Sequence, residues 1–426
     1  MNNLEESRKK INEIDKEMRE LFLQRLKVVE DVARYKKLNN LNIYDEKREK
    51  EVIEKNIVAV DKSMQSYYYS YITKVMDISK EYQGNYLASA NTIFLNYPII
   101  VENGSINKFY SYFNIKSKIL VITDKNVPTT YINCFLKKDQ VFVYTIGCGE
   151  NNKTMNNILT IVDYLIDNKF TREDCIVAVG GGMVCDLASF AASIYMRGIK
   201  HYLVPTTLLA QVDASIGGKT AINYQNLKNV IGTFNNPSGV LIDPLTLNSL
   251  SKRLFNEGMA EVIKMSIVHS PTFFDYLLTI KEPYDITYII KEAISIKKMV
   301  VEKDFKDLGL RKTLNFGHTI GHAIEAITDG KLYHGECVAL GMLYMCDKEV
   351  YNKLYELLKK FSLPTNINLD TDTIISKVVH DKKNQNNNIN IIYVDKIGHY
   401  INKNITLEEL KNLLEEKKKE LELGDK

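Results

Sequence analysis

The sequence predicts a multidomain protein in which a three-helix, all-α domain precedes an α/β half and then an α-helical half. Residues 4–83 contain neither proline nor glycine, and apolar residues recur in them every three or four positions. From Thr92 onward, short β-branched runs alternate with helical periods, as in a parallel sheet covered by helices. From about Lys252 to Lys348 only the helical periodicity remains. The predicted segments are 1–88, a linker at 89–94, 95–248 and 249–426.

Composition narrows the class of protein. With 56 basic and 53 acidic residues, the net charge of +3 is too small to indicate a nucleic-acid-binding protein. The six cysteines are scattered singly with no CxxC pair, which indicates reduced thiols in a reducing compartment. The N-terminus is polar, unlike a signal peptide, and no apolar stretch approaches the roughly 20 residues of a membrane span. We therefore expect a soluble, cytoplasmic protein that contacts neither membrane nor nucleic acid.

The β-branched runs locate the clearest strands of the α/β half. We expect strands at 119–123, 141–144, 176–179 and 202–204. Near the end of the chain, Glu and Lys at i,i+4 spacings over 406–423 predict a closing amphipathic helix. The Asn-rich stretch 384–390 is expected to be a polar loop.

The first helix should extend from Leu4 to about Leu38, and its apolar face carries positive charges. At about 100° per residue, one stripe is formed by Ile11, Ile14, Met18, Leu21, Phe22, Val28, Val29 and Val32. Arg25 and Lys36 fall inside this stripe, and Arg8 lies at its edge. Basic side chains can lie over apolar surface with their charges in water, but two cations in one stripe favour an anionic ligand, because burying an unpaired charge is costly. A helix of roughly 50 Å is too long for so small a domain to cover, so we expect dimerisation through this face.

Over residues 4–87 the helical domain resembles the all-helical chorismate mutases. The resemblance rests on the run from Arg8 to Asp15, on Asp45-Glu-Lys-Arg48-Glu49, and on Arg25, Lys36, Ser79 and Gln83 at matching spacing. It implies a dimer whose long first helices cross between subunits. The implied site binds the two carboxylates of chorismate through Arg25, Arg48 and Arg8 of the partner subunit, the ether oxygen through Lys36 and Gln83, and the hydroxyl through Glu49, with Asp45 and Ser79 in support.

The chemistry implied for this domain is simple. The rearrangement is unimolecular, so the protein need only hold a folded conformer and stabilise charge on the ether oxygen. Two alternatives remain open: a domain that binds chorismate or prephenate as a feedback sensor, and a purely structural helical dimer.

A glycine-rich turn follows the predicted strand at 176–179. Gly180, Gly181 and Gly182 would let backbone N–H groups approach a pyrophosphate at the start of a helix. Such a turn can also join a strand to a helix without any ligand, and the ordinary GxGxxG pattern is not met. The later Gly-Gly-Lys219-Thr is not a P-loop, because Asp213 stands where that motif needs its first glycine.

Three of the seven histidines cluster in one stretch of sequence. His318 and His322 share a helix face at i,i+4 spacing, and His334 follows shortly after. The third histidine could complete three points of a metal site, with a carboxylate such as Glu261 as another ligand and an open position for substrate. The alternative is that these are ordinary core or surface histidines.

From about residue 95 to 400 the chain resembles 3-dehydroquinate synthase. The motifs are Gly147-x-Gly149-Glu150-x-x-Lys153, Gly180-Gly-Gly-x-x-x-Asp186, Tyr195-Met-Arg197-Gly, the run from Pro205 to Thr220, Lys228-Asn229, Gly258-Met-Ala-Glu261-Val-Ile-Lys264, and Gly309-Leu-Arg311 running into the histidine segment. The resemblance implies a homodimer with a dinucleotide-binding α/β half and an α-helical metal-binding half. The implied contacts to NAD come from Asp124, Asn126, Glu150, Lys153, Gly180, Gly181, Gly182, Asp186, Thr206 and Thr207, with Lys219 and Lys228 close to both cofactor and substrate.

The same resemblance implies a reaction and a ligand set. Zinc, or cobalt as a substitute, would be bound by Glu261, His318 and His334, which makes His322 a neighbour of the substrate phosphate and a proton-transfer partner. The substrate would be 3-deoxy-D-arabino-heptulosonate 7-phosphate. Its phosphate end would be bound by Lys219, Asn229, Lys382 or Lys383, and Arg197 of the partner subunit. Its carboxylate and hydroxyls would be bound by Lys264, Lys297, Arg311 and Asn315. Asp213 would face both the nucleotide and the substrate.

Some positions depart from the family pattern, and some related activities compete with this interpretation. Leu227 replaces a usual glycine just before Lys228 and Asn229, and Ser251 replaces a usual proline. The competing interpretations are an inosose-type cyclase, a glycerol-type polyol dehydrogenase, and a regulatory scaffold. The many lysines and arginines of these motifs suit a substrate with two anionic ends, and the substrate of a plain dehydrogenase would not need them.

Overall fold

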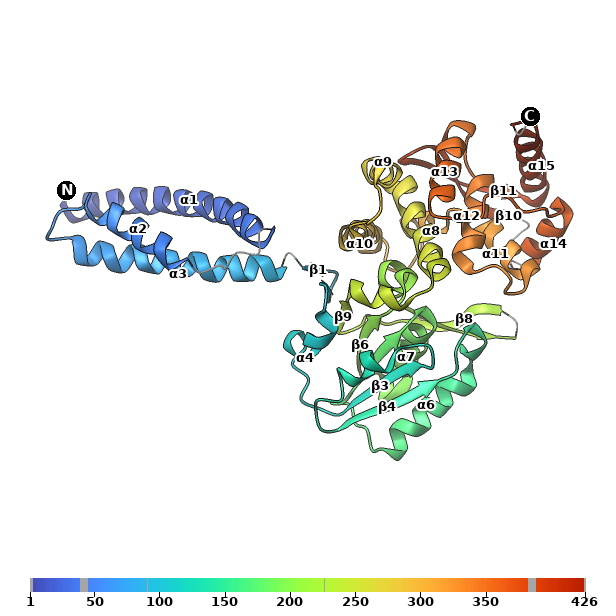
Figure 1. Ribbon diagram of the computed structural model, residues 1–426, viewed down its shortest axis with the longest axis horizontal. Coiled ribbons are helices and arrows are strands. Elements are labelled where there is room, and N and C mark those ends of the chain that lie inside the picture. The colour runs from blue at the N-terminus through green and yellow to red at the C-terminus, as the bar shows by residue number, and fades with distance from the viewer. Residues whose placement is uncertain (1–2, 39–44, 90, 226, 382–387, 425–426) are drawn as a thin grey trace. The chain divides into compact units, whose positions relative to one another are not determined.

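The protein folds as two compact units, Met1–Ile93 and Phe94–Lys426. The computed structural model describes residues 3–38, 45–89, 91–225, 227–381 and 388–424. Figure 1 shows the first unit as helices alone and the second as a sheet with helices followed by a largely helical half. The chain passes from one unit to the other within the short strand β1 (Thr92–Phe94). In the described part of the chain, no helix is long and apolar enough to cross a bilayer.

The first unit consists of α1 (Asn3–Leu38), α2 (Glu46–Ile57) and α3 (Gln65–Ser89), which confirms the predicted long first helix. Helix α3 packs against both α1 and α2. Asp45 begins α2, because its side chain accepts a hydrogen bond from the Arg48 N–H at 3.0 Å.

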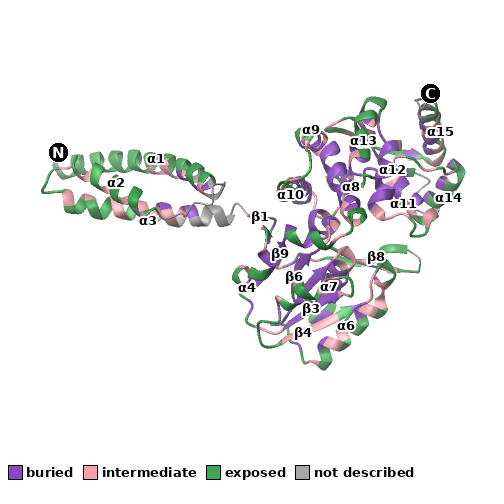
Figure 2. Ribbon diagram, in the orientation of Figure 1, coloured by how far each residue is buried: buried purple, intermediate pink, exposed green. Residues whose placement is uncertain are grey.

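Much of the predicted apolar stripe on α1 is not covered within the unit. Val29 is buried, whereas Ile11, Ile14 and Leu21 are 54%, 56% and 64% exposed. Met18, Val28 and Val32 are exposed as well, so Figure 2 shows α1 mostly in the colour of exposed residues. The unit therefore has more apolar surface on α1 than its own helices bury.

The second unit contains a parallel sheet that is buried on both faces. Its parallel strands run in the order β2 (Pro98–Val101), β9 (Gly239–Ile242), β6 (Lys200–Pro205), β5 (Cys175–Gly180), β3 (Ile119–Asp124) and β4 (Val141–Ile146). Every residue of β5 is buried, as expected for a central parallel strand. Val121, Val177 and Val179 pack with Phe109 and Phe135 in one core cluster. The four predicted strands are confirmed, whereas β2 and β9 are additional.

Helices and one β-hairpin complete the α/β half. The helices are α4 (Phe109–Tyr112), α5 (Thr129–Asn133), α6 (Met155–Asp167) and α7 (Gly182–Ile194), and α7 packs on β5 and β6. The hairpin consists of β7 (Lys219–Tyr224) and β8 (Leu227–Phe234). Because Gly217 and Gly218 have positive φ and a strand begins at Lys219, the Gly-Gly-Lys-Thr segment is a turn into a hairpin and not a phosphate loop that opens a helix.

The remaining half is built around α8. Its helices are α8 (Lys252–His269), α9 (Pro271–Thr279), α10 (Ile286–Lys303), α11 (His318–Thr328), α12 (His334–Tyr344), α13 (Lys348–Lys360), α14 (Thr371–Asp381) and α15 (Leu407–Gly424). Ser251 accepts a hydrogen bond from the Leu254 N–H and so begins α8 without the usual proline.

This half also contains a hairpin, formed by β10 (Asn388–Lys396) and β11 (His399–Thr406). The prediction of a loop over 384–390 is wrong for its last three residues, which start β10; residues 384–387 lie outside the described residues. Asparagines of these strands pair with one another across the hairpin, as Asn390 does with Asn402 at 2.7 Å. Most residues of β11 are exposed and follow no apolar alternation, so the sequence offered no signal for that strand.

Candidate active sites

A buried carboxylate lies at the centre of the histidine cluster. Glu261, from the middle of α8, is 0% exposed. Its Oε1 is 3.8 Å from His318 Nε2 and 3.6 Å from His334 Nε2, and its other oxygen pairs with Lys264 one turn along the same helix. Oε1 accepts no hydrogen bond from any residue that the structure describes. A buried carboxylate oxygen left in this state indicates that a further group belongs at this point.

Glycines bring the two histidine-bearing helices together. Helix α11 starts at His318 and α12 at His334. A Cβ on Gly341 would lie 2.0 Å from the Gly317 carbonyl oxygen, and one on Gly321 would lie 3.0 Å from the Cys337 carbonyl oxygen. Only glycine permits this close crossing, and the crossing places the first residues of both helices next to Glu261.

The hydrogen bonds of the two histidine rings direct their Nε2 atoms to the same point. Nδ1 of His318 lies 3.2 Å from the Phe316 carbonyl oxygen, and Nδ1 of His334 lies 3.3 Å from Glu325 Oε2. A neutral imidazole that donates from Nδ1 keeps a lone pair on Nε2, which is the usual arrangement of a histidine that binds a metal.

The electrostatics at this point favour a positive charge. Burial and the neighbouring Lys264 hold the pKa of His318 well below its usual value. Burial would also lower the pKa of His334, but Glu261 and Glu325 outweigh it and raise that pKa to about 10. Burial would likewise raise the pKa of Glu325, but His334 and Lys228 outweigh it and lower it to about 2. Two carboxylates thus face one imidazole, and a metal cation would supply the charge they favour.

The geometry fits a small divalent cation. Tetrahedral ligands at about 2.0–2.1 Å from zinc lie about 3.4 Å apart, close to the separations of Glu261 from the two histidines. A third histidine, His322, has a nitrogen within 4.8 Å of the ligand atoms of His318 and His334. His322 is exposed, whereas His318 and His334 are partly buried. Distance alone does not decide which three side chains would bind the ion.

Three of the predicted basic site residues are also buried, and Lys264 among them pairs with Glu261. Lys264, Lys297 and Arg311 are 2%, 5% and 3% exposed, although such residues are rarely buried. Lys297 Nζ pairs with the Asp213 carboxylate and donates to the Asp213 carbonyl oxygen at 2.5 Å. Burial lowers the pKa of Lys297 to about 8. Arg311 donates to the Phe305 carbonyl oxygen at 2.7 Å, and burial lowers its pKa as well.

The glycine turn lies between β5 and α7, as the sequence predicts. Gly180 ends β5 and Gly182 begins α7, a helix of 13 residues. A Cβ on Gly181 would lie 3.2 Å from Thr207 Cγ2, and one on Gly182 would lie 3.3 Å from Ala214 Cβ. Glycine at both positions lets Thr207 and Ala214 pack closely against the start of α7, and a helix N-terminus suits the pyrophosphate of a dinucleotide.

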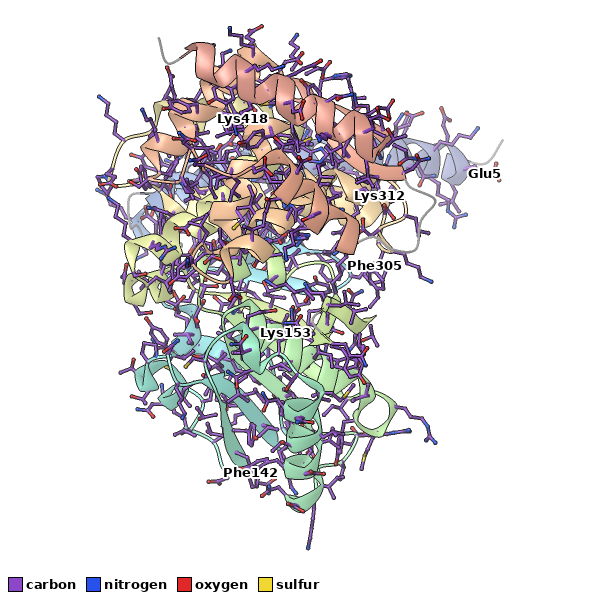
Figure 3. All side chains as sticks on the ribbon, turned by 90° about the vertical axis from the view of Figure 1, so that its right-hand side faces the viewer. Glu5, Phe142, Lys153, Phe305, Lys312 and Lys418 are labelled. Atoms are coloured by element: carbon purple, nitrogen blue, oxygen red, sulfur yellow. The ribbon has the colours of Figure 1, made fainter. Side chains whose placement is uncertain are left out.

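A charged network lies beside this turn and includes several residues predicted to contact NAD. Lys153 is 4% exposed, and its Nζ is 2.5 Å from Asp186 Oδ2 and 3.9 Å from Glu150 Oε1. Burial would lower the pKa of Lys153, but the two carboxylates outweigh it and raise it. In Figure 3, Lys153 lies where the α/β half faces the helical half. Asp124 is the last residue of β3, and the Asn126 N–H donates to its Oδ1 at 2.7 Å, whereas Thr206 follows β6.

The hairpin β7–β8 carries three of the predicted site residues. Lys219 Nζ is 2.5 Å from Asp307 Oδ2. Lys228 Nζ is 2.6 Å from Glu325 Oε1, and Asn229 accepts a hydrogen bond from Lys153 Nζ at 2.5 Å. Leu227 thus does not prevent the hairpin from presenting Lys228 and Asn229 to both halves of the unit.

Some predicted residues stand apart from this cluster or are not described. Arg197 is exposed after α7 and has a positive φ of 66°. Asn315 is exposed just before α11. Lys382 and Lys383 lie outside the described residues.

In the helical unit the structure brings together part of the predicted chorismate site. Arg25 on α1 donates a hydrogen bond to the Ser79 hydroxyl on α3. One turn further along α3, Gln83 is 7% exposed, and its Oε1 has no hydrogen-bond partner among the residues that the structure describes. Lys36 is partly buried on α1. Arg25, Ser79 and Gln83 form a polar group on α1 and α3, and Lys36 lies further along α1.

The other predicted residues of this unit are differently engaged. Glu49 pairs with Lys80 at 2.6 Å, and Arg48 is exposed, 3.5 Å from Glu51. Hydrogen bonds from Lys80 to Glu49 and Asp77 raise the pKa of Lys80. Arg8 and Arg25 are 17 positions apart on α1, or about 25 Å at 1.5 Å per residue, so Arg8 of the same chain lies too far away to share a small ligand with Arg25.

Comparison with known proteins decides the family. A profile of the N-terminal part of 3-dehydroquinate synthases matches residues 143–257, and one of their C-terminal part matches 258–384. The 3-dehydroquinate synthase of Thermodesulfovibrio yellowstonii is 40% identical in an alignment of 348 residues that covers 75% of this chain and 97% of that protein. That of Clostridium beijerinckii is 39% identical in an alignment of 327 residues that covers 71% of this chain and 93% of that protein. The chain belongs to the 3-dehydroquinate synthase family.

This synthase has an additional N-terminal domain. A profile of type II chorismate mutases matches residues 7–84, so the enzyme combines a chorismate mutase domain with a 3-dehydroquinate synthase. We refer to Met1–Ile93 as the mutase unit and to Phe94–Lys426 as the synthase unit.

Solved structures share the fold of the synthase unit. A 2-deoxy-scyllo-inosose synthase, solved with carbaglucose-6-phosphate, NAD+ and Co2+, has a TM-score of 0.70 and 26% identity, over 76% of this chain and 99% of that chain. A probable glycerol dehydrogenase from Sinorhizobium meliloti is similar in fold alone, with a TM-score of 0.51 and 15% identity over 75% of this chain and 95% of that chain.

Sequence reasoning assigned no role to three residues of the synthase unit that contact predicted site residues. Glu325 lies between Lys228 and His334, Asp307 pairs with Lys219, and Asn223 donates to Glu150 at 2.9 Å. Glu325 follows His318 by seven positions and so lies on the same helix face, which is the one signal the sequence offers for it.

Proposed function

We propose that the synthase unit converts 3-deoxy-D-arabino-heptulosonate 7-phosphate into 3-dehydroquinate and phosphate, using NAD and a divalent metal. Zinc, with cobalt as a substitute, fits the ligand set of one carboxylate and two imidazoles. We propose further that the mutase unit rearranges chorismate to prephenate. Family membership supports both activities, and the cytoplasm is the compartment in which we expect them.

One observation favours the synthase reaction over a simple dehydrogenation. Lys264, Lys297 and Arg311 are all buried; Lys264 pairs with Glu261, which lies beside two imidazoles, and Lys297 pairs with Asp213. Burying several cations is costly unless anionic groups meet them. A substrate with a carboxylate and a phosphate supplies such groups, whereas a neutral polyol does not.

The chain itself binds and orients the reactants in this proposal. Glu261, His318 and His334 would hold the cation, and the turn at 180–182 with Lys153 and Asp186 would hold NAD. When bound, NAD would take up and return a hydride at C5, and the cation would make the hydroxyl on C5 easier to deprotonate. Asp213 orients Lys297 toward the substrate. Arg311 is suited to bind a carboxylate with two parallel hydrogen bonds.

The phosphate end of the substrate would lie nearer the hairpin. Lys219, Lys228 and Asn229 would contact the phosphate, with Arg197 of the partner subunit and Lys382 or Lys383. His322 would transfer a proton on the same side. The phosphate can assist its own elimination, so the enzyme mainly positions the groups that react.

The deciding experiment supplies the keto-sugar phosphate with NAD and zinc and follows inorganic phosphate and NADH together. We expect phosphate and 3-dehydroquinate to form without net NADH, because each turnover regenerates NAD. Accumulation of NADH without phosphate would instead identify a dehydrogenase. Chorismate is supplied in a separate assay, and the absence of prephenate there would leave the mutase unit with a role as a feedback sensor or a structural element.

The mutase unit is expected to act as a dimer through α1. From Ile11 to Val32 the exposed apolar positions and Arg25 follow spacings of three and four, which is the pattern of a helix–helix seam. A second copy would cover this seam and bring its Arg8 toward Arg25. Ile14→Glu should therefore reduce the mass of the full-length oligomer and its prephenate formation, with phosphate release retained. Asn12→Glu, off the seam, is the control in light scattering, and an unchanged mass for Ile14→Glu would contradict the dimer.

A further inference from the structure

The β7–β8 hairpin contacts the predicted cofactor site through Asn229. The Asn229 side chain accepts from Lys153 Nζ at 2.5 Å, and its N–H donates to Asn223 Oδ1 at 2.9 Å. Asn223 in turn donates to Glu150 at 2.9 Å. Asn229 is held with a positive φ of 55°. The position of this residue is therefore tied to the charged network beside the glycine turn.

The neighbouring residue of the same strand contacts the metal half. Lys228 Nζ lies 2.6 Å from Glu325 Oε1 on α11, and Glu325 Oε2 lies 3.3 Å from His334 Nδ1. Nε2 of His334 faces Glu261 Oε1 at 3.6 Å. Each oxygen of Glu325 thus has a different partner, one from the hairpin and one from the predicted metal ligands.

The chemistry of Glu325 fixes the role of each nitrogen of His334. A carboxylate that pairs with an ammonium group is ionised and can only accept hydrogen bonds. Nδ1 of His334 must therefore be an N–H donor, so in the neutral imidazole that binds a cation the lone pair is on Nε2, the nitrogen that faces Glu261. Carboxylates that orient metal-binding histidines in this way raise their affinity for the ion.

We propose that Glu325 is a positioning residue that couples the cofactor and metal sites through Lys228. The proposal rests on the proposed function only in that the synthase unit binds NAD and a divalent cation. Binding of NAD beside Lys153 orders Asn229 and Lys228, and Lys228 then holds Glu325 in the orientation that directs His334 toward the cation. Because coupling between sites is reciprocal, the cation must strengthen NAD binding by the same factor.

The exposure of each contact sets the size of its effect. The side chain of Lys228 is 53% exposed and that of Glu325 is 15% exposed. A half-exposed ion pair contributes little, so we expect NAD to tighten metal binding by about fivefold. The better-shielded contact between Glu325 and His334 should matter more, with about a tenfold loss of metal affinity when the carboxylate is removed.

The test measures Zn2+ affinity by chelator competition with and without saturating NAD, in the full-length protein. Glu325→Gln keeps the shape of the side chain but loses its charge, and Lys228→Met removes only the partner on the hairpin. Glu302→Gln, which removes a surface carboxylate paired with Lys298 on α10, is the matched control. The visible absorption of bound Co2+ reports the ligand geometry directly, and circular dichroism verifies folding.

We expect Glu302→Gln to behave like the wild type. Lys228→Met should keep its metal affinity without NAD within about twofold and lose the fivefold response to NAD. Glu325→Gln should bind Zn2+ about tenfold more weakly, lose the response to NAD and change the Co2+ spectrum. Wild-type metal affinity and spectrum in Glu325→Gln, or a retained NAD response in Lys228→Met, would overturn the proposal.

These outcomes are separate from those that test the proposed function. A wild-type protein that shows the coupling but forms no 3-dehydroquinate would refute the function and support the coupling. If the wild type turned over the substrate and both variants bound metal and NAD like the wild type, the function would be supported and the coupling refuted.

Discussion

Replacing His334 by alanine should abolish metal binding and phosphate release by the synthase unit and leave prephenate formation unchanged. His334 provides one of two imidazole nitrogens that face the buried Glu261, at 3.6 Å. Its loss leaves one histidine and one carboxylate, too few for tight binding of zinc. Because the cation contributes several kcal/mol of charge stabilisation, we expect phosphate release to fall by at least about 10³-fold.

Metal content by elemental analysis, phosphate release and prephenate formation are measured on the same preparation. His399→Ala is the control, because His399 is a 65% exposed histidine paired with Asp395 on the β10–β11 hairpin. It should change none of the three measurements. Full metal content in His334→Ala would show that the cation is bound elsewhere, and loss of prephenate formation would show that the two units do not act independently.

The parts of the fold that sequence predicts best are those with strong periodicity. The uninterrupted helical pattern over residues 4–38 gave α1 at nearly its observed bounds, and continuous β-branched runs gave β3, β4, β5 and β6. Strands β7 and β8 were not predicted: β8 is almost entirely exposed, and the buried residues of β7 are Thr220 and Ile222, so neither strand has an alternating apolar pattern. Whether such segments form strands depends on their tertiary packing, which a local sequence pattern does not reveal.

Some site residues could likewise be placed from the sequence, and others could not. Residue type and i,i+4 spacing placed His318 and His322 on one helix face, but spacing alone could not order them as ligands. The structure places Glu261 Oε1 near Nε2 of both His318 and His334. Glu325 was assigned no role, because its importance depends on two partners that are 97 and 9 residues away in the chain. Contacts of this kind become visible only when the helices and the hairpin are packed together.

The predicted chorismate site is only partly assembled by one chain. Its residues were predicted from a resemblance in spacing, and the structure places Arg25 and Ser79 in contact between α1 and α3. Arg48 is exposed, and Arg8 of the same chain is too distant from Arg25 to join it. The dimer proposed above would complete the site with Arg8 of a second copy.

Arg25→Ala should therefore abolish prephenate formation and leave phosphate release intact. Arg25 is the cation that lies within the α1 seam and also contacts α3, so it is placed to bind a substrate carboxylate at the centre of the site. Loss of a preorganised charged donor typically lowers a rate by about 10²–10³-fold. Arg25→Lys retains the charge but not the paired N–H groups, so it should recover only part of the activity.

Arg19→Ala, an exposed residue of the same helix, is the matched control and should retain both activities. Circular dichroism separates a catalytic defect from unfolding, because Arg25→Ala removes a single hydrogen bond to Ser79 and should change the free energy of unfolding by only about 1 kcal/mol. If folded Arg25→Ala still formed prephenate at the wild-type rate, the polar group formed by Arg25, Ser79 and Gln83 would not be the site of the rearrangement. If the wild-type protein bound chorismate but formed no prephenate, the mutase unit would be a sensor. The chorismate affinity of Arg25→Ala would then measure the contribution of Arg25 to binding alone.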